Sequence, residues 1–510
     1  MNKKIKKVLV ANRGEIAVRV MRCCRDMDIR SVAVYSNCDA TALHVRTADE
    51  AYAIGPSPSS ESYLAVDKIL NVAKQSGADA VHPGYGFLAE NAAFAERCEK
   101  NGLVFIGPRP ETIRLLGDKL LARDTALKAK LPVVPGADIG GHGLDNALAV
   151  AGDIGFPILI KAAAGGGGKG MRVVESEDQF AESMSSAARE AESAFGDNRV
   201  YIEKYLRRPR HIEIQILCDQ HGNAIYLGER ECSIQRRHQK VIEESPSPIM
   251  TPELRKRMGE AAVNIARQAG YVGAGTVEFM VDEDLSFYFL EVNTRLQVEH
   301  PVTEMVTGLD LVKEQIYVAE GRPLRYRQED IQLRGHALEC RIYAESPEEG
   351  FIPSTGILNH YRQPAGPGVR VDAGVLLFSE IPVYYDPMIA KLVTWGEDRR
   401  DAINRMKRAL AEYRIGGVDS TIGFHLVMMD DERFRSGDFH TRFLEEAYPN
   451  NDYTRRDEIV RETAAIAVAL DKFIKERRIA VGHSTRGREC RSNWAAVHRR
   501  RNLEPFGGSR

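Results

Sequence analysis

Apolar residues follow two alternating patterns over the first 117 residues. Short apolar runs such as "KVLV", "SVAVYS", "ADAVH" and "LVFIG" predict buried strands, while "GEIAVRVMRCCRDM" and "YLAVDKILNVAKQSG" have apolar positions at helical spacing. Regular alternation of strands and helices predicts a doubly wound α/β domain with a parallel sheet over residues 1–117. The segment "HPGYGF", residues 82–87, follows one of these strands. We expect it to line a site, because ligands bind at the carboxyl ends of such strands.

The pattern changes at residue 118. "DKLLARDTALKAK" predicts a helix that ends before Pro132, and "FPILIK", "RVYIEKYL" and "HIEIQIL" predict strands. Antiparallel pieces dominate this part of the chain, which predicts an α+β region over residues 118–330. The pattern of residues 331–450 predicts a further strand-rich unit. Its strands run from "HALECRIYAE" to "YYDPMIAKLVTW", and the helix "DRRDAINRMKRALAEY" follows them.

The last sixty residues differ from the rest in charge. The chain has a net charge of −2, but residues 451–510 hold 14 Lys and Arg against 8 Asp and Glu. Thr454 with Asp457 suits a helix N-terminus. An apolar stripe follows, formed by Ile459, Ile466, Leu470 and Phe473. Whether this basic helical tail packs on its own chain or docks on a partner stays open.

The composition narrows the class of protein. Hydrophobic residues make up 43% and charged residues 28%, as in ordinary globular proteins, and the near-neutral charge gives no case for nucleic acid or membrane binding. No apolar run approaches membrane-spanning length, and the run after the basic N-terminus is too short for a signal peptide. The eight cysteines form no C-x-x-C pair, which argues against zinc and against a disulfide framework. We therefore expect reduced thiols and a cytoplasmic location.

The stretch "IKAAAGGGGKGMRVV" contains four consecutive glycines between two apolar runs. It matches G-x-G-x-x-G, but "MRVV" predicts a strand where a dinucleotide site needs a helix. Ala163 and Gly170 also exclude a P-loop. A flexible linker and a phosphate-binding hairpin tip remain. In the second interpretation, backbone N–H groups approach phosphates without side-chain obstruction, helped by Lys161 and Lys169. The glycines of the tip are Gly165, Gly166, Gly167 and Gly168.

The stretch "GTVEFMVDEDLSFYFLEVNTR" predicts two strands joined by an acidic turn. Glu278 and Glu291 are equidistant from the centre of that turn, so they face each other if the hairpin has no bulge. Like charges directly opposite are destabilising unless a cation lies between them. Asn293 lies on the same face as Glu291. Two carboxylates and an amide oxygen suit Mg²⁺ or Mn²⁺. The alternative is a solvated polar face.

The same alternation continues through Arg295, Gln297 and Glu299. A cation, an amide and a carboxylate placed close together are able to hold a small oxyanion and remove its proton. A structural salt bridge is an equally good interpretation of Glu299. The stretch "SIQRRHQKVIEE" reads as a basic, amide-rich strand that faces either phosphates or solvent.

Seven motifs occur in order along the chain: "ANRGEIA", "HPGYGFLAEN", "KAAAGGGGKGMRVV", "IEKYL", "QRRHQKVIEE", "EVNTRLQVEHPVTE" and "GHALECRIYAE". Together they resemble the biotin carboxylase component of biotin-dependent carboxylases, over about residues 4–447. The resemblance implies the ATP-grasp fold: an N-terminal α/β domain (1–117), an ATP-grasp domain (118–330) with a mobile lid at about 134–206, and a C-terminal domain (331–450). The sequence departs from the family at Ala162–Ala164, where Ala-Ser-Gly is common, and this change could stiffen the lid.

The resemblance also implies roles for individual residues. Those matching ATP contacts are Lys119, Lys161, Glu203, Lys204, Leu206, His211, Gln235 and His238. Those matching metal ligands are Glu278, Glu291 and Asn293, in agreement with the hairpin argument. Those matching the bicarbonate site are Lys240, Arg295, Gln297 and Val298, with Glu299 as the base. Arg341 matches the arginine that steadies the biotin enolate, and Tyr85 matches a residue near the biotin pocket.

The implied reaction uses ATP, two Mg²⁺ or Mn²⁺ ions and bicarbonate to carboxylate biotin through carboxyphosphate. The chain has no A-M-K-M sequence, so the biotin belongs to a separate carrier protein, and a carboxyltransferase uses the product. A homodimer is also implied. The final acceptor stays open among acetyl-CoA, propionyl-CoA, another acyl-CoA and pyruvate. Three alternatives remain: another ATP-grasp ligase of carbamoyl-phosphate or purine type, an NAD-dependent oxidoreductase, and a non-catalytic subunit.

Overall fold

The computed structural model describes residues 4–139, 144–162, 172–195, 200–237, 239–453, 466 and 468–473. Residues 1–454 form one compact unit, and residues 455–510 form a second. The predicted glycine tip, His238, Thr454, Asp457 and Ile459 lie outside the described residues. Within the tail, residues 468–473 are helical, and Ile466, Leu470 and Phe473 are exposed.

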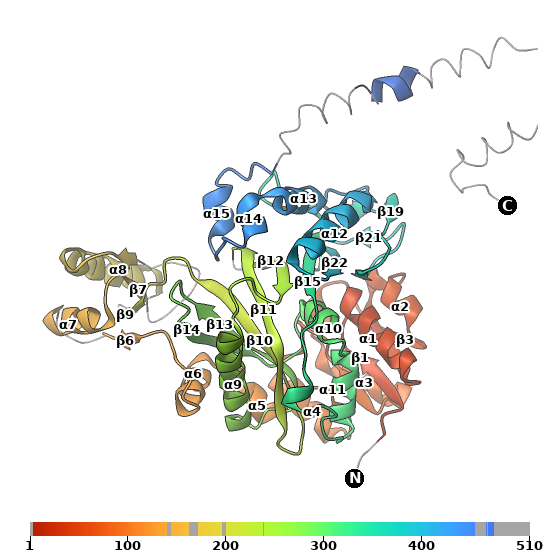
Figure 1. The fold of residues 1–510 in the computed structure, drawn as a ribbon. Coiled ribbons are helices and arrows are strands. Elements are labelled where there is room, and N and C mark those ends of the chain that lie inside the picture. The colour runs from red at the N-terminus through yellow and green to blue at the C-terminus, as the bar shows by residue number, and fades with distance from the viewer. Residues whose placement is uncertain are drawn as a thin grey trace, which may run out of the picture. The chain divides into compact units, whose positions relative to one another are not determined.

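The N-terminal part is a five-stranded parallel sheet in the order β3-β2-β1-β4-β5, with helices on both faces (Figure 1). This confirms the predicted doubly wound α/β arrangement. Its strands are β1 (Lys7–Val10), β2 (Arg30–Ser36), β3 (Glu50–Gly55), β4 (Ala80–His82) and β5 (Val104–Phe105). Its helices are α1 (Gly14–Asp26), α2 (Leu43–Thr47), α3 (Val66–Ser76), α4 (Ala92–Lys100) and α5 (Pro110–Gly117).

The strand order reverses between β1 and β4, which brings together the loops that follow these two strands. Asn12 Nδ2 donates to the carbonyl oxygens of Pro83 and Tyr85, at 2.7 and 2.8 Å. The "HPGYGF" loop is therefore held against the start of α1. This is the crevice in which α/β sheets bind ligands.

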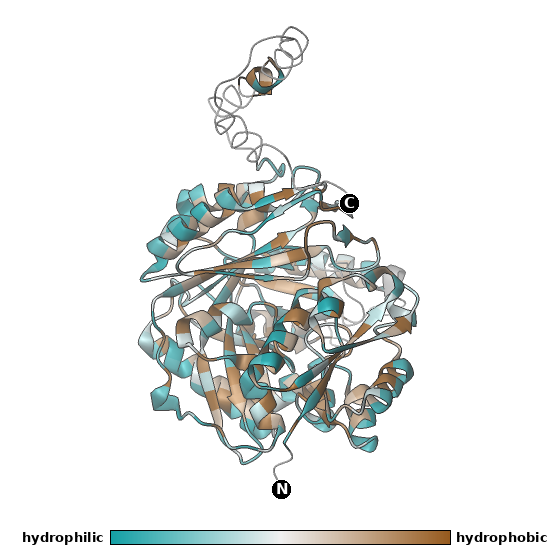
Figure 2. Ribbon diagram, turned by 90° about the vertical axis from the view of Figure 1, so that its right-hand side faces the viewer, coloured by the Kyte–Doolittle hydropathy of each residue, from teal (hydrophilic) through white to brown (hydrophobic). Residues whose placement is uncertain are grey.

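The centre is an eight-stranded antiparallel sheet in the order β14-β13-β10-β11-β12-β15-β22-β20. Its strands are β10 (Arg210–Cys218), β11 (Ala224–Arg236), β12 (Gln239–Ser245), β13 (Gly273–Val281), β14 (Phe287–Asn293), β15 (His336–Tyr343), β20 (Val369–Ala373) and β22 (Met388–Gly396). The β12–β15 pairing joins strands from both sides of residue 330 into one sheet. Figure 2 shows apolar residues concentrated on the strands and on the helix faces that pack against them.

Helices surround this sheet. They are α6 (Lys119–Lys128), α9 (Pro252–Gln268), α10 (His300–Thr307), α11 (Leu311–Ala319), α12 (Arg399–Glu412), α13 (Ile422–Asp430), α14 (Glu432–Ser436) and α15 (Phe443–Ala447). Short strands complete the C-terminal part: β16 (Glu345–Ser346), β17 (Ile352–Pro353), β18 (Gly356–Ile357), β19 (His360–Arg362), β21 (Glu380–Ile381) and β23 (Arg414–Gly416). No helix among the described residues has both the length and the apolar character needed to cross a membrane.

A small four-stranded sheet forms a separate layer and projects from the body at the left of Figure 1. Its elements are β6 (Gly136–Asp138), α7 (Leu144–Ile154), β7 (Ile158–Ala162), β8 (Arg172–Val174), α8 (Phe180–Phe195) and β9 (Val200–Lys204). It has its own apolar core, which includes Ile158, Ile160 and Phe180. Strand β8 pairs antiparallel with β7, so the element after the glycines is a strand. This confirms the exclusion of a dinucleotide loop.

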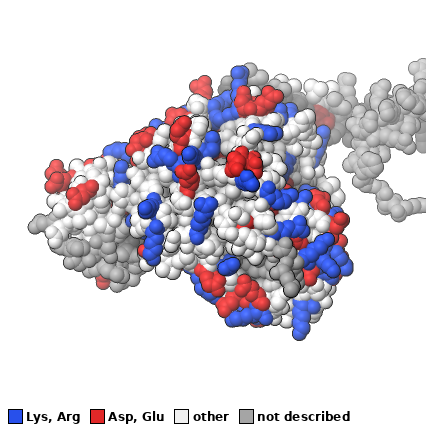
Figure 3. Space-filling model, turned by 60° about the horizontal axis from the view of Figure 1, so that its bottom comes forward, with Lys and Arg blue, Asp and Glu red and all other residues white. Residues whose placement is uncertain are grey.

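The surface carries both signs of charge. On the face in Figure 3, basic and acidic side chains are interspersed. Some exposed charges of the protein form ion pairs, for example Arg97–Asp67 and Lys100–Glu96. Pairs of this kind contribute little stability.

Candidate active site

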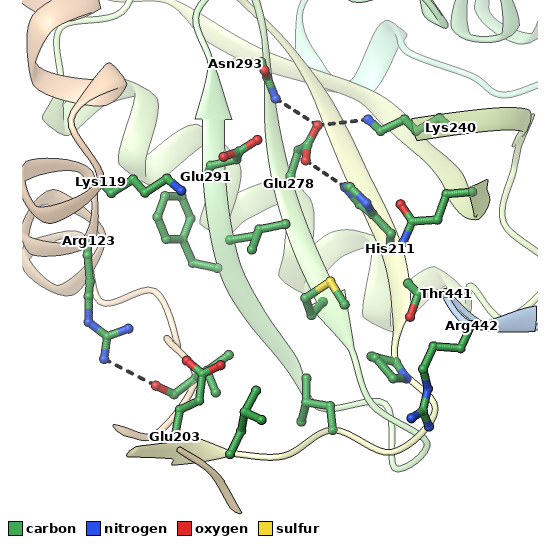
Figure 4. A pocket seen from close by; sticks show the side chains of 18 of the residues that line it. Lys119, Arg123, Glu203, His211, Lys240, Glu278, Glu291, Asn293, Thr441 and Arg442 are labelled. Atoms are coloured by element: carbon green, nitrogen blue, oxygen red, sulfur yellow. Dashed lines mark hydrogen bonds and ion pairs between the residues drawn. The ribbon is translucent and has the colours of Figure 1, made fainter. Parts of the chain in front are cut away.

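A cleft of about 1700 Å³ separates the small sheet from the central sheet and α15. Most of the side chains singled out from the sequence line it (Figure 4). These are Lys119, Lys161, Glu203, Lys204, Leu206, His211, Gln235, Lys240, Glu278, Glu291, Asn293, Arg295, Gln297, Val298, Glu299 and Arg341. Tyr85 lies outside this described lining. Residues more than 200 positions apart thus converge on one cleft.

The two acids of the β13–β14 hairpin face each other, as predicted. Glu278 pairs directly with Glu291. The loop and the strand pairing that produce this register differ from those of a simple hairpin. Asp282 N donates to Ser286 O at 2.8 Å, which closes a three-residue loop, with Leu285 at a φ of 63°. The register then shifts by one residue beside Glu278, at exposed Leu290, and this shift restores the predicted pairing.

The buried Glu278 carboxylate is surrounded by donors. Its Oε1 accepts from Lys240 Nζ at 2.9 Å, and from the amides of Asn293 and Gln297 at 2.8 Å each. Its Oε2 lies 2.8 Å from His211 Nε2. Burial opposes ionisation of this carboxyl, but Lys240 and His211 outweigh burial and hold the pKa of Glu278 well below its usual range. Figure 4 shows the Lys240, His211 and Asn293 contacts together.

Glu291 is exposed to the cleft beside Glu278. Restricted hydration, and after it the charge of Glu278, raise the pKa of Glu291. A divalent cation between the two carboxylates would offset their repulsion, and carboxylate and amide oxygens are hard ligands. The Asn293 amide lies beside the pair: its Nδ2 donates to Glu278 Oε1 at 2.8 Å, and its Oδ1 accepts from Arg295 Nη2 at 3.0 Å. The donor set therefore fits Mg²⁺ or Mn²⁺.

One ammonium group lies among three carboxylates. Lys240 Nζ contacts Glu213, and it lies 2.9 Å from Glu278 and 2.6 Å from Glu299. Arg341 Nη2 reaches the other oxygen of Glu299 at 3.0 Å. Burial raises the pKa of the Glu299 carboxyl, but Lys240, Arg341 and Arg230 together outweigh burial and lower it overall. These cations hold Glu299 in its ionised form.

The strand alternation predicted for residues 295–299 is wrong. β14 ends at Asn293, and a loop and turn lead from there to α10. Arg295 instead forms an ion pair with Glu90, with Nε 2.9 Å from Oε2. Arg295, Gln297 and Glu299 nevertheless line the cleft together, because the loop folds back over the ends of β13 and β14.

The stretch "SIQRRHQKVIEE" is not one strand. β11 ends at Arg236 and β12 begins at Gln239, with Arg237 in the turn at a φ of 48°. The polar run conceals this turn because it contains neither glycine nor proline. As a consequence Gln235 pairs with Lys240. Both side chains line the cleft.

The small sheet and α6 contribute the opposite wall. Lys161 on β7 forms an ion pair with Glu203 on β9, and Tyr201 donates to Glu203 Oε2 at 2.7 Å. Lys119 is the first residue of α6, which the side chain of Asp118 caps. Lys204 and Leu206 follow at the end of β9. This wall brings Lys119, Lys161 and Lys204 to the same cleft as the Glu278–Glu291 pair, and Lys119 lies close enough to oppose the rise in the pKa of Glu291.

Two buried cations behind the cleft were missed from the sequence. Arg230 donates to Glu213, Gln215, Thr276, Gln297 and Thr303, all on its own side of the sheet. Lys391 donates to the carbonyl of Val298 at 2.7 Å and lies 3.1 Å from Glu15 Oε1. It also lies over the ring of Tyr85, 5.6 Å from the centroid. Lys391 thus connects the predicted biotin-pocket tyrosine to the cleft.

Comparison with known proteins agrees with this arrangement. Residues 4–113 match the family described as "Biotin carboxylase, N-terminal domain" and residues 339–446 match "Biotin carboxylase C-terminal domain". Between them, residues 118–327 match "Carbamoyl-phosphate synthase L chain, ATP binding domain".

A pyruvate carboxylase subunit of Methanothermobacter thermautotrophicus is 56% identical over 475 residues, covering 93% of this chain and 96% of that protein. Biotin carboxylase 1 of Bacillus subtilis is 54% identical over 442 residues, with coverages of 86% and 98%. A solved dimer, the biotin carboxylase domain of Hydrogenobacter thermophilus 2-oxoglutarate carboxylase with MgADP, ADP and bicarbonate, is 48% identical. Its TM-score is 0.78, and the match covers 89% of this chain and 100% of that one. The chain belongs to the biotin carboxylase family and has the ATP-grasp fold.

Proposed function

We propose that the cleft performs the ATP-dependent carboxylation of biotin, with the residue roles that the sequence predicted. One observation carries these roles. Lys240 binds Glu299 and Glu278 at once, so the predicted base and the predicted metal ligand share a cation beside a facing carboxylate pair. This arrangement brings charge neutralisation and proton acceptance to one point, which phosphoryl transfer to bicarbonate requires.

ATP occupies the wall formed by the small sheet, α6 and β11. Its contacts are Lys119, Lys161, Glu203, Lys204, Leu206, His211 and Gln235. His238 and the four glycines remain predictions for the same site. The residues that would hold Mg²⁺ or Mn²⁺ are Glu278, Glu291 and Asn293. When bound there, the cation neutralises charge on the ATP phosphates.

Bicarbonate lies between Arg295, Gln297, the backbone of Val298 and Lys240. Glu299 takes its proton as a bicarbonate oxygen attacks the γ-phosphorus, and ADP departs. The carboxyphosphate formed separates into CO₂ and phosphate. The released phosphate takes the N1′ proton of biotin, Arg341 holds the negative oxygen of the enolate, and N1′ bonds to CO₂. Tyr85 lies at this biotin end, behind Lys391.

Biotin arrives on a separate carrier protein, and a carboxyltransferase takes the carboxyl group onward. We further propose a homodimer, as in the Hydrogenobacter structure, and a cytoplasmic location, which suits the free cysteines among the described residues. The alignment with the Methanothermobacter protein exceeds 450 residues and so includes part of the tail. This part of the tail is thus shared with a protein that is named as a subunit of pyruvate carboxylase, and this favours docking of the tail on a partner.

The test is carboxylation of free biotin by this chain alone, followed as acid-labile label from ¹⁴C-labelled bicarbonate. We expect incorporation that requires ATP, bicarbonate and biotin together, and its loss in Glu299→Gln. The matched control is Glu304→Gln, a buried glutamate on the following helix, outside the cleft lining, which should keep the activity. Bicarbonate-dependent ADP release that ignores biotin would overturn the proposal. Transfer to ammonia or an amine in a substrate screen would favour the other ATP-grasp ligases instead.

A further inference from the structure

Behind Arg341, on the side away from the cleft, lies a group of buried charges that the proposed reaction does not use. Its members are Glu243 on β12, Glu339 on β15 and Lys391 on β22, and Glu15 of α1 contacts Lys391. In the sheet register Glu243 pairs with Glu339, and Arg341 pairs with Lys391. These four strand residues therefore share one face of the sheet.

The two cations of this cluster, Arg341 and Lys391, already form ion pairs with other carboxylates. Arg341 Nε binds Glu243 Oε1 at 2.6 Å, and its Nη2 binds Glu299. Lys391 binds Glu15 and the carbonyl of Val298. Within the described part of the chain, neither oxygen of Glu339 has a hydrogen-bond partner, and the second oxygen of Glu243 has none either. Glu339 is thus a fully buried carboxyl in excess of the available cations, opposite another carboxyl.

A carboxylate left unpaired in a protein interior costs several kcal/mol, and a like charge directly opposite adds to that cost. Glu243 is the register partner of Glu339 on the neighbouring strand and has one oxygen without a donor, so a proton shared between the two carboxyls would give each of them a partner. We propose that Glu339 is a protonated positioning residue, which donates its hydrogen to Glu243 and thereby keeps Arg341 shared between Glu243 and Glu299. This role rests on the proposed assignment of Arg341 to the biotin enolate.

The electrostatic surroundings support this state. Burial, and after burial Glu243 and Glu299, raise the pKa of Glu339 well above its usual range, although Lys391 and Arg341 oppose the shift. Burial also raises the pKa of Glu243, but Glu243 has an ion-pair partner in Arg341 at 2.6 Å, whereas both oxygens of Glu339 lack a hydrogen-bond partner among the described residues. In the pair, Glu339 therefore retains the proton.

The protonated state of Glu339 determines how Glu243 binds Arg341. If Glu339 donates to Glu243, one Glu243 oxygen is satisfied and binds the guanidinium only through the other. If the donor is lost, both Glu243 oxygens are free to take Arg341 as a two-bond pair. The guanidinium would then withdraw from Glu299 and from the biotin end of the cleft. The ATP contacts lie on the far side of Glu278 and would not move.

The test compares two substitutions at this position. Glu339→Leu preserves volume and removes the donor, and such replacements of buried charged groups often leave stability unchanged or improve it. We expect it to lower biotin carboxylation about tenfold, the effect of one buried hydrogen bond, while the KM for ATP stays unchanged. Glu339→Gln, whose amide also donates, should retain the activity of the natural chain. In the natural chain, ionisation of Glu339 at alkaline pH should lower the rate of biotin carboxylation. Glu339→Gln should keep its rate there, because the amide does not ionise.

Infrared difference spectroscopy at neutral pH detects directly whether the Glu339 carboxyl is protonated. The spectrum of the natural chain minus that of Glu339→Gln should contain the C=O band of a protonated carboxyl. The matched control is Glu244→Gln, the next residue on β12, whose carboxylate is ion-paired with Arg399 and should remove only ionised-carboxylate bands. Absence of the protonated band in the Glu339 difference overturns the proposal. The positioning role is overturned if Glu339→Leu carboxylates biotin at the rate of the natural chain. It is also overturned if Glu339→Gln is as slow as Glu339→Leu.

These outcomes are distinguishable from failure of the proposed function. Arg341→Lys should impair biotin carboxylation if Arg341 serves the enolate. If it does not, the assignment of Arg341 fails, and the infrared comparison still decides whether Glu339 holds a proton.

Discussion

Arg230 offers the sharpest test of how the cleft is built. Its side chain is fully buried, and its five N–H donors reach five acceptors. Two of these acceptors belong to the site: Glu213, which binds Lys240, and Gln297, whose Oε1 accepts at 2.8 Å while its Nε2 donates to Glu278. Arg230 therefore fixes which way the Gln297 amide faces.

The magnitude follows from these contacts. Removing one partner of a buried ion pair costs about 3–5 kcal/mol, so Arg230→Met should lose that much of a total stability of about 5–15 kcal/mol. Arg230→Lys keeps the charge, but its three donors cannot reach five acceptors. Gln297 Oε1 then loses its donor, and only the Nε2 bond to Glu278 still orients the amide. We expect the KM for bicarbonate to rise about tenfold, equivalent to about 1.4 kcal/mol, with little change in the KM for ATP.

The assay is bicarbonate-dependent ADP release, measured over a range of bicarbonate concentrations, together with urea unfolding. Arg399→Met is the matched control: Arg399 is also paired with a buried glutamate, Glu244, at 2.7 Å, but it lies outside the cleft lining. It should lose comparable stability and keep its KM for bicarbonate. A normal bicarbonate KM in Arg230→Lys would refute the reasoning, because Gln297 would then hold its orientation without the guanidinium.

Two further predictions concern carboxylates. Glu278→Gln and Glu291→Gln should each raise the Mg²⁺ concentration needed for half-maximal ATP cleavage; unchanged Mg²⁺ titrations in both variants would remove these residues from the metal site. Glu244 is buried, yet Arg399 and His336 outweigh burial and lower its pKa from 4.5 to about 2. Its contribution of roughly 3 kcal/mol is therefore complete above pH 4.5 and is lost as pH falls toward 2. Urea midpoints measured from about pH 5 downward should fall more gently in Glu244→Gln than in the natural chain, and equal slopes would contradict the shift.

Local patterns were sufficient to predict most elements. Four of the five strands of the parallel sheet, all but β3, are short apolar runs, and α1 and α3 have apolar stripes at helical spacing, so these elements need no tertiary information. Gly77 ends α3 with a φ of 63°, the conformation that favours glycine at a helix end. The α/β and antiparallel regions were therefore predictable from the sequence alone.

The predicted Glu278–Glu291 register is correct because two deviations from a simple hairpin offset each other. The three-residue loop alone would move the pairing by one position and turn Glu291 to the other face. The extra residue at Leu290 moves it back. Nothing in the letters indicates either deviation, because Leu285 replaces the glycine that usually marks such a loop.

The buried polar face of the central sheet was not predictable in the same way. In "HIEIQIL" the polar residues Glu213 and Gln215 alternate with isoleucines, which is typical of a strand with one face in water. Here α10 and the loop before it cover that face, so both residues are fully buried. Only their burial makes Arg230 obligatory, and burial depends on segments some 70 residues away.

The same dependence applies to the biotin end of the cleft. Lys391 comes from β22, its partners Glu15 and Val298 come from α1 and from the loop before α10, and Arg341 lies directly across from it on β15. If these segments separated, Glu15 and Glu243 would be buried without their cations, a state that costs several kcal/mol per charge. The charges balance only when all three parts of the chain are packed together. Packing of these parts and alignment of Arg341 with Glu299 are therefore one event, and the sequence of any single part cannot show it.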